Sequence, residues 1–162
     1  MARKWNMASY ADIHELQNKI MKDTTEGLTA LIVQNMQYIG ERCVAIARDK
    51  NRANTWGDVT GNLRSSIGYI VQVNGKAVIK SNIEVYEGRD GQKAQKGAPA
   101  ARALLKSLQG TKQSGVVLFV VAGMNYAEYV EDIRHRDVLA TSWLEGERLA
   151  NKLLGQLFSK TK

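Results

Sequence analysis

An apolar stripe between residues 28 and 47 constrains the fold of this 162-residue chain more than any other feature. The residues of the stripe recur at helical spacing: Leu28, Leu31, Ile32, Met36, Ile39, Cys43 and Ala47. Steps of three and four place side chains on one face of an α-helix, which needs a packing partner to be stable. The sequence therefore predicts a helix that ends near Asp49 and buries this face.

A shorter amphipathic helix is predicted before it, over 9–22, because Ile13, Leu16 and Ile20 recur at the same spacing. Ser9 is the expected N-cap. The run Asp23-Thr24-Thr25 predicts a new cap or a bend between the two helices.

Alternation of apolar and polar residues predicts strands after a loop over 51–61. Ser65–Val73 places Ile67, Tyr69, Val71 and Val73 on one face. Asn74-Gly75 then predicts a tight hairpin, because a type I′ turn needs a positive φ at both central residues. The return strand is expected over 76–81, and the pattern allows it to continue through 83–86.

A glycine-rich segment, Gly88–Gly115, follows and contains the only proline, Pro99. We expect a flexible insertion, in which 100–108 can form a short helix. Only one acid, Asp90, accompanies its six basic residues, which are Arg89, Lys93, Lys96, Arg102, Lys106 and Lys112. These six are candidates for docking an acidic partner or for touching phosphates, and a solvated loop is the plain alternative. The segment has no aromatic residue for stacking on bases.

The remainder predicts one more strand and one more helix. Val116–Ala122 is apolar throughout, which predicts a central strand covered on both faces. Asp137 is the expected cap of a C-terminal helix, whose inner stripe is Leu139, Trp143, Ala150, Leu153 and Leu157. The chain is therefore predicted to be a single α+β domain over 1–162. It has long N-terminal helices, a small, mainly antiparallel sheet with an inserted basic loop, and a C-terminal helix packed on the sheet.

No constellation of a catalytic or metal centre is predicted, so we expect neither an enzyme nor a cofactor. His14 and His135 are far apart, and Cys43 lies on the apolar stripe as a small buried thiol. The segment Gly110–Gly115 has the glycine spacing of a phosphate loop but lacks the following Lys-Ser/Thr pair. Glu128 and Glu131 are only i,i+3 neighbours.

Composition excludes further classes. The hydrophobic fraction of 44% and the charged fraction of 24% are typical of a globular protein, and the net charge is +7. No apolar run approaches the roughly 20 residues of a membrane span. A single cysteine forms no intrachain disulfide and is compatible with a reducing compartment, so we expect a cytoplasmic place of synthesis.

Two short motifs are more specific. The first runs from Trp56 to Ile67 and the second from Val121 to Glu131. In the first motif, Gly61 allows a positive φ that ends the loop. Leu63 anchors the strand, and Arg64 is free to pair with an acid. In the second, the two tyrosines are i,i+3, so both rings are expected to cover the end of the sheet. The residues concerned are Thr60, Gly61, Leu63, Arg64, Ser66, Tyr126, Ala127, Tyr129 and Glu131. We interpret them mainly as residues that specify the fold.

In this order, the two motifs resemble a family of small tailed-bacteriophage proteins known as tail-completion, head–tail joining or minor tail components. The resemblance spans residues 28 to 158 without the insertion. In that family a helical region leads into the first motif and a strand, a second strand leads into the second motif, and a helix closes the domain. The family usually has glycine after the motif glutamate, where this chain has Asp132.

The resemblance implies a structural virion protein that joins the head connector to the tail. Its partners would be the connector or stopper and the tail tube, and it would form a ring of six or twelve copies at the head–tail junction, assembled in the host cytoplasm without a membrane. One alternative is a nonspecific DNA-contacting protein of the packaging or ejection channel. Another is a host-directed interaction module that reuses the fold.

Overall fold

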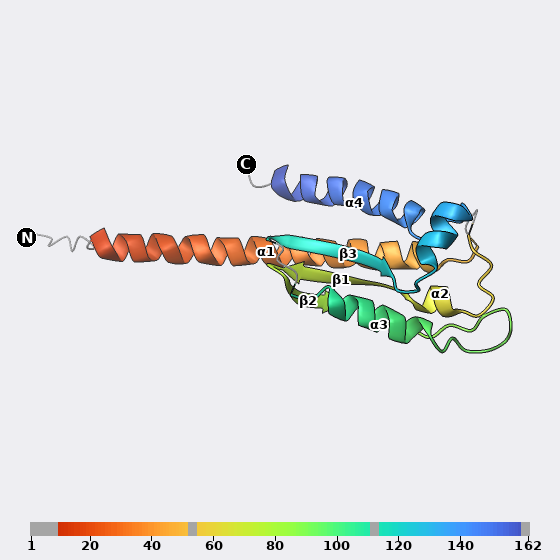
Figure 1. The fold of residues 1–162 in the computed structure, drawn as a ribbon. Helices are drawn as coiled ribbons and strands as arrows, with labels where there is room; N and C mark the ends of the chain where they lie inside the picture. The colour runs from red at the N-terminus through yellow and green to blue at the C-terminus, as the bar shows by residue number, and fades with distance from the viewer. Residues whose placement is uncertain (1–9, 52–54, 111–113, 160–162) are drawn as a thin grey trace, which may run out of the picture.

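The computed structural model describes residues 10–51, 55–110 and 114–159. The elements in chain order are α1 (Tyr10–Arg48), α2 (Asn62–Ser65), β1 (Ile67–Val73), β2 (Lys76–Lys80), α3 (Gly97–Ser107), β3 (Val116–Ala122), the π-helix η1 (Tyr129–Ile133) and α4 (Ala140–Ser159). The α+β class is confirmed, with a long N-terminal helix, a small antiparallel sheet and a C-terminal helix (Figure 1).

The N-terminal region is one helix, so the prediction of two separate helices with a new cap at 23–25 is wrong. The hydroxyl groups of Thr24, Thr25 and Thr29 each donate to the carbonyl oxygen four residues earlier, at 2.8 Å. Because these hydroxyls are satisfied inside the helix, they do not cap a new one. The proposed N-cap, Ser9, lies outside the described residues.

The sheet has the order β2-β1-β3, and both pairings are antiparallel. The hairpin turn is confirmed, with φ values of 50° at Asn74 and 78° at Gly75. The prediction that Val116–Ala122 forms the central strand is wrong, because β1 is central and β3 lies at an edge. The first residue of the predicted first strand, Ser65, instead ends α2, the strand begins at Ile67, and 83–86 do not extend β2.

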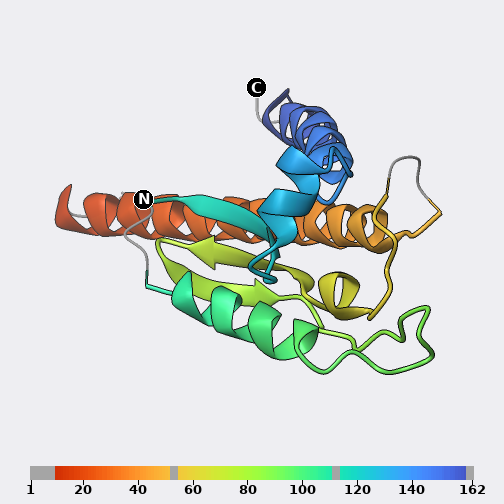
Figure 2. The same ribbon diagram turned by 45° about the vertical axis from the view of Figure 1, so that its right-hand side comes forward.

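Helices cover the sheet on both faces (Figure 2). On one face, Tyr69 and Val71 of β1 are buried in the main core beneath α1. A Cβ at Gly40 of α1 would lie 2.6 Å from the Tyr69 ring, so glycine permits this close packing. On the other face, Ile70 packs with Leu105 of α3. The central strand is therefore buried on both sides, which the alternation in the sequence did not indicate.

The segment 88–115 is more ordered than an inserted loop. Within it, 97–107 form α3, whose Ala98, Ala101 and Leu105 are buried against the sheet. The side-chain oxygen of Asn62 accepts hydrogen bonds from the backbone N–H groups of Lys96 and Gly97, at 2.9 and 3.1 Å. The prediction of a flexible insertion is therefore wrong for these residues, and the short helix that the sequence allowed begins three residues earlier.

The last helix packs on the α1 side of the sheet, mainly along α1, and Leu149 joins a cluster with Leu118 and Val120 of β3. Its inner face differs from the predicted one, because Trp143 is 68% exposed while Ser142 and Gly146 are buried. A Cβ at Gly146 would lie 2.7 Å from the sulfur of Cys43, so glycine lets the two helices approach closely. Leu139, Ala150, Leu153 and Leu157 are partly buried, in agreement with the predicted stripe.

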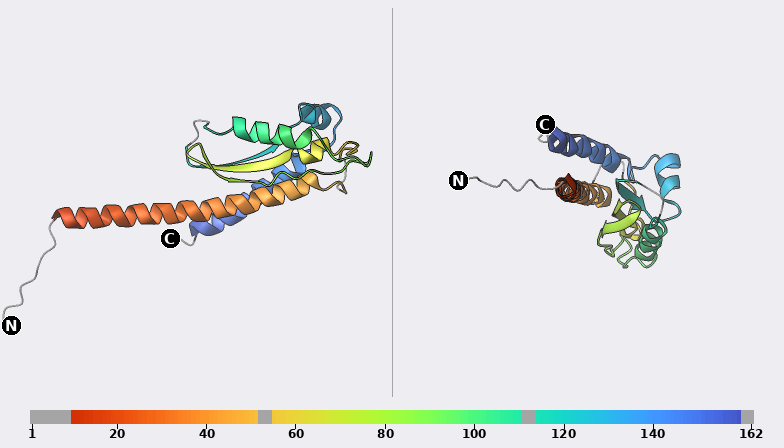
Figure 3. Two further views of the ribbon diagram at one scale, coloured as in Figure 1. Left: turned by 90° about the horizontal axis from the view of Figure 1, so that it is seen from below. Right: turned by 90° about the vertical axis from the view of Figure 1, so that its left-hand side faces the viewer.

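The N-terminal part of α1 extends well beyond the sheet and α3 (Figures 1 and 3). We call residues 10–27 of α1 the arm. All side chains of residues 17–27 are exposed, so this part of the arm is not buried against the rest of the described chain. Among the described residues, no helix is long and apolar enough to cross a membrane.

Candidate functional site

The first motif forms the turn between the loop and α2. Gly61 has a φ of 67°, as predicted, and a Cβ there would lie 2.5 Å from the carbonyl oxygen of Tyr86. The side-chain nitrogen of Asn62 donates to the hydroxyl of Thr60 at 3.1 Å. Glycine is needed here both for its conformation and for the close approach of the chain over 86–88.

Arg64 pairs with an acid, as predicted from the motif, and the acid is Asp58. The Nη1 atom of Arg64 lies 3.1 Å from Oδ2 of Asp58, and both side chains are largely buried. The guanidinium also lies over the ring of Tyr86, 4.1 Å from its centroid. Tyr86 was not singled out in the sequence, because nothing in its neighbourhood indicates that it meets a residue 22 positions earlier.

The two motifs meet at one end of the sheet. The backbone N–H of Gly123 donates to the carbonyl oxygen of Ser66 at 2.9 Å. The N–H of Met124 donates to the hydroxyl of Ser66 at 3.3 Å. The same hydroxyl donates to the carbonyl oxygen of Leu63 at 2.7 Å. These bonds continue the β1–β3 pairing beyond its last pair, so Ser66 fixes how the second motif leaves the sheet.

The second motif turns through η1, and its tyrosines do not both cover the end of the sheet. Tyr126 and Tyr129 are 37% and 49% exposed, whereas Ala127 is buried. Ala127 packs in the main core together with the partly buried Val130. Burial, and then the negative charge of Asp58, raise the pKa of the Tyr126 phenol. The predicted role of the two rings is therefore wrong, and the smaller residues between and after them make the core contact.

Glu131 holds the start of α4. Its Oε1 atom accepts hydrogen bonds from the backbone N–H groups of Leu139 and Ala140, at 3.1 and 2.6 Å. The predicted cap, Asp137, accepts one from Thr141 at 3.1 Å. Two carboxylates thus satisfy N–H groups that have no partner within the helix, and their charge is favourable at a helix N-terminus. Motif residues therefore bond inward and connect elements, as expected for residues that specify the fold.

The basic residues of 88–115 do not form one loop. Arg89, Lys93 and Lys96 are exposed on the irregular segment before α3, whereas Arg102 and Lys106 are exposed on α3 itself. Together with Lys80 of β2, these two helix residues line a groove of about 430 Å³. Lys112 lies outside the described residues.

The described part of the chain contains no group of three or more His, Cys, Asp or Glu residues that could hold a metal ion. Cys43 is buried, and desolvation, followed by the charge of Glu145, raises the pKa of its thiol. His135 is exposed. The side chain of His14 lies outside the described part.

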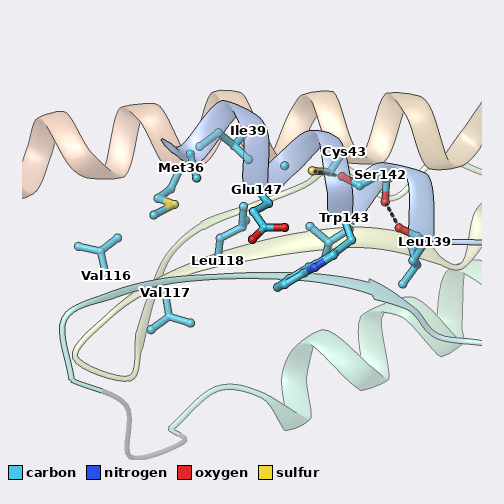
Figure 4. A pocket seen from close by; sticks show the side chains of 13 residues that line it. Met36, Ile39, Cys43, Val116, Val117, Leu118, Leu139, Ser142, Trp143 and Glu147 are labelled. Atoms are coloured by element: carbon cyan, nitrogen blue, oxygen red, sulfur yellow. Dashed lines mark hydrogen bonds between the residues drawn. The ribbon is translucent and has the colours of Figure 1, made fainter. Parts of the chain in front are cut away.

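An apolar groove, which the sequence analysis missed, opens on the α1 side of the sheet (Figure 4). Its volume is about 380 Å³. Most of its lining is aliphatic or aromatic and comes from α1, β3, α4 and the residue before α4: Met36, Ile39, Cys43, Val116, Val117, Leu118, Val120, Leu139, Ser142, Trp143, Gly146, Glu147 and Ala150. Trp143 and Glu147 point from α4 toward β3. The consecutive apolar pair Trp143-Leu144 was the available signal, because adjacent residues of a helix point about 100° apart and so widen its apolar surface beyond a narrow stripe.

Comparison of the chain with models of protein families, with curated proteins and with solved structures gave no match.

Proposed function

We propose that this chain is a structural virion protein of a tailed bacteriophage, a tail-completion or neck component at the head–tail junction. It acts by docking to other proteins, without chemistry of its own. Its partners would be the connector or stopper on one side and the tail tube on the other. In this proposal it assembles in the host cytoplasm as a ring of six or twelve copies.

The observation that carries the proposal is that the domain leaves three surfaces of the kind that usually contact a partner uncovered. The groove between β3 and α4 is apolar and open, β3 is a sheet edge, and residues 17–27 of the arm are all exposed. Apolar clefts and unpaired edges are costly in an isolated domain unless a partner covers them. A protein whose work is assembly has such surfaces by necessity.

The family motifs support the proposal in a second way. Ser66, Gly123 and Glu131 join the sheet to the last helix through backbone hydrogen bonds, so the motifs are explained by the fold that they build. A docking protein needs its motifs for shape, because its affinity comes from interfaces repeated around a ring.

Mass spectrometry of purified virions tests this function. We expect the protein in particles at roughly six to twelve copies, the number of the proposed ring. The control is a second, non-structural protein of the same infected cells, which purification should remove. If the protein is absent from particles at the detection limit for one copy, the proposed function is wrong, and a host-directed role becomes the better explanation.

A second candidate function, nonspecific DNA contact, is favoured by the basic groove of Lys80, Arg102 and Lys106. Contact with phosphates predicts DNA binding that weakens steeply with salt, because bound counterions are released. We expect a Arg102→Ala, Lys106→Ala double variant to lower the slope of log K against log salt by about two. An unchanged slope, or no retention on DNA at low salt, would exclude this groove as a DNA site.

A further inference from the structure

We propose that the apolar groove between β3 and α4 is the docking site for the arm of a second copy of this chain. The contact is head-to-tail, since each copy offers one arm and one groove. This inference specifies the contact between neighbours in the proposed ring and rests on that proposal for closure of the ring. The contact itself can be tested on the isolated protein.

The arm carries an apolar face that its own domain does not cover. Ile20 is 55% exposed and Leu31, just after the arm, is 48% exposed. They are 11 residues apart, which is about three turns, so they lie on the same side of α1. Met21 is also exposed, and it broadens the face. An amphipathic helix of this kind is stabilised by burying its apolar face.

The composition of the arm also calls for a partner. Thr24, Thr25 and Gly27 have low helix propensity, and Gly27 has no side chain to pack. Short helices without tertiary contacts are marginal in water, since most helical stability in proteins comes from packing. Docking in a groove supplies the contacts that the domain does not.

The groove cannot receive the arm of its own chain. Met36, Ile39 and Cys43 form part of its wall, and they belong to the same unbroken helix as the arm. An arm that folded back would have to break α1. The occupant is therefore another molecule.

Length fits a second copy. Residues 10–27 span about 27 Å as a helix. The groove is lined from Leu139, just before α4, to Ala150, a helical length of about 17 Å. The groove can thus hold about three turns of the arm, which is the spacing from Ile20 to Leu31.

Charge distinguishes docking on the body from pairing of two arms. Residues 10–27 contain four acids and two lysines, a net charge of −2, whereas residues 28–162 contain 19 basic and 12 acidic residues, a net charge of +7. Two acidic arms repel each other, while an acidic arm is attracted to a basic body. A second copy therefore offers a better site on its domain than on its arm, and the attraction acts through the body as a whole, since the one charged residue that lines the groove, Glu147, is itself acidic.

The decisive experiment is intermolecular photo-crosslinking on the full chain. Ile20 is replaced by benzoylphenylalanine in unlabelled protein, which is mixed with ¹⁵N-labelled protein without the probe. We expect crosslinks from residue 20 to labelled peptides that contain 116–120 or 139–150. Crosslinks mainly to labelled peptides within 10–31 would overturn the proposal in favour of arm pairing, and the absence of any intermolecular crosslink would overturn it altogether.

Sedimentation velocity with matched variants provides the second measurement. An Ile20→Asp variant places a carboxylate in the contact and should weaken self-association by about tenfold or more. Asn18→Asp puts the same charge on the opposite side of the arm and should leave association within about twofold. Trp143→Ala, at the exposed rim of the groove, should also weaken it, and the exposed Val78→Ala on β2 should not. If Ile20→Asp and Asn18→Asp associate equally, the proposal is wrong.

These outcomes are separate from the proposed function. Virions that lack the protein would refute the neck role while crosslinks from arm to groove still stood. Virions that contain it would leave the neck role intact if the crosslinks failed, and the groove would then be assigned to a different virion protein.

Discussion

The carboxylate of Glu131 accepts a hydrogen bond from the backbone N–H of Ala140, the first residue of α4, at 2.6 Å. The second motif thereby determines where the last helix starts, although the two residues are nine positions apart. Asp132 follows within the π-helix η1, and the chain then reaches α4.

Replacing Glu131 by alanine should destabilise the fold by about 1–2 kcal/mol, because a helix N-terminus loses its cap. Urea unfolding followed by circular dichroism measures this change. The control is Glu128→Ala, which removes an exposed carboxylate only three residues earlier. Equal losses in the two variants would show that the cap contributes nothing.

Breaking the ion pair of Asp58 and Arg64 should lower the free energy of unfolding more than removing the Glu131 cap does. An Asp58→Asn variant keeps the shape and tolerates the positive φ of 43° at this position, but it removes the negative charge opposite the guanidinium. Breaking a largely buried pair costs about 3 kcal/mol. The free energy of unfolding of this variant is compared with that of Glu87→Gln, which neutralises an exposed acid. A loss below that of the control would mean that stacking on Tyr86 alone holds Arg64.

The sequence predicted local structure better than it predicted packing. The stripe on α1, the turn at Asn74-Gly75 and the α+β class depend on periodicity and turn chemistry, which are local. The place of β3 at the sheet edge depends on which strands pair, and an apolar run alone cannot distinguish a central strand from an edge strand with helices on both sides. The inner face of α4 was predicted wrongly at Trp143, because a large apolar residue normally lies in a core.

In the candidate site, too, the features that depend on local sequence were predicted and those that depend on distant contacts were not. The positive φ of Gly61 and the pairing of Arg64 with an acid follow from residue type and were predicted. The contacts of Ser66 with Gly123 and Met124 join residues nearly 60 positions apart, and no local signal indicates them. The groove is formed by three separate elements, so it exists only once the chain is folded.

The contact between α1 and α4 depends on Gly146. A Gly146→Ala variant should lose about 1–3 kcal/mol, because its Cβ would lie 2.7 Å from the sulfur of Cys43. On the same helix, Gly155→Ala has open space around its Cβ and should gain about 0.5–1 kcal/mol from helix propensity.

A double-mutant cycle identifies the cause of the loss at Gly146. In a Cys43→Ala background the sulfur is absent, so adding the methyl group at 146 should cost little or stabilise the helix pair. Thermal unfolding of the four proteins gives the coupling. If Gly146→Ala costs the same in both backgrounds, contact with the sulfur is not the reason for glycine at this position.

The phenol of Tyr69 should make stability sensitive to alkaline pH. Burial first, and then its 2.7 Å hydrogen bond to Glu41 and the charge of that carboxylate, raise the pKa of Tyr69 above its usual value. The unfolded chain releases this proton near pH ~10, while the folded protein retains it. The stabilisation that the neutral phenol provides is therefore complete below pH ~10 and is lost as the pH rises further, by up to about 1.4 kcal/mol per pH unit.

A Tyr69→Phe variant has no proton to release, so its stability should fall less steeply between pH 9 and 11 in urea titrations. Other tyrosines and lysines contribute equally to both proteins, so the difference in slope isolates Tyr69. Equal slopes would show that the phenol is not held in its neutral form by the fold.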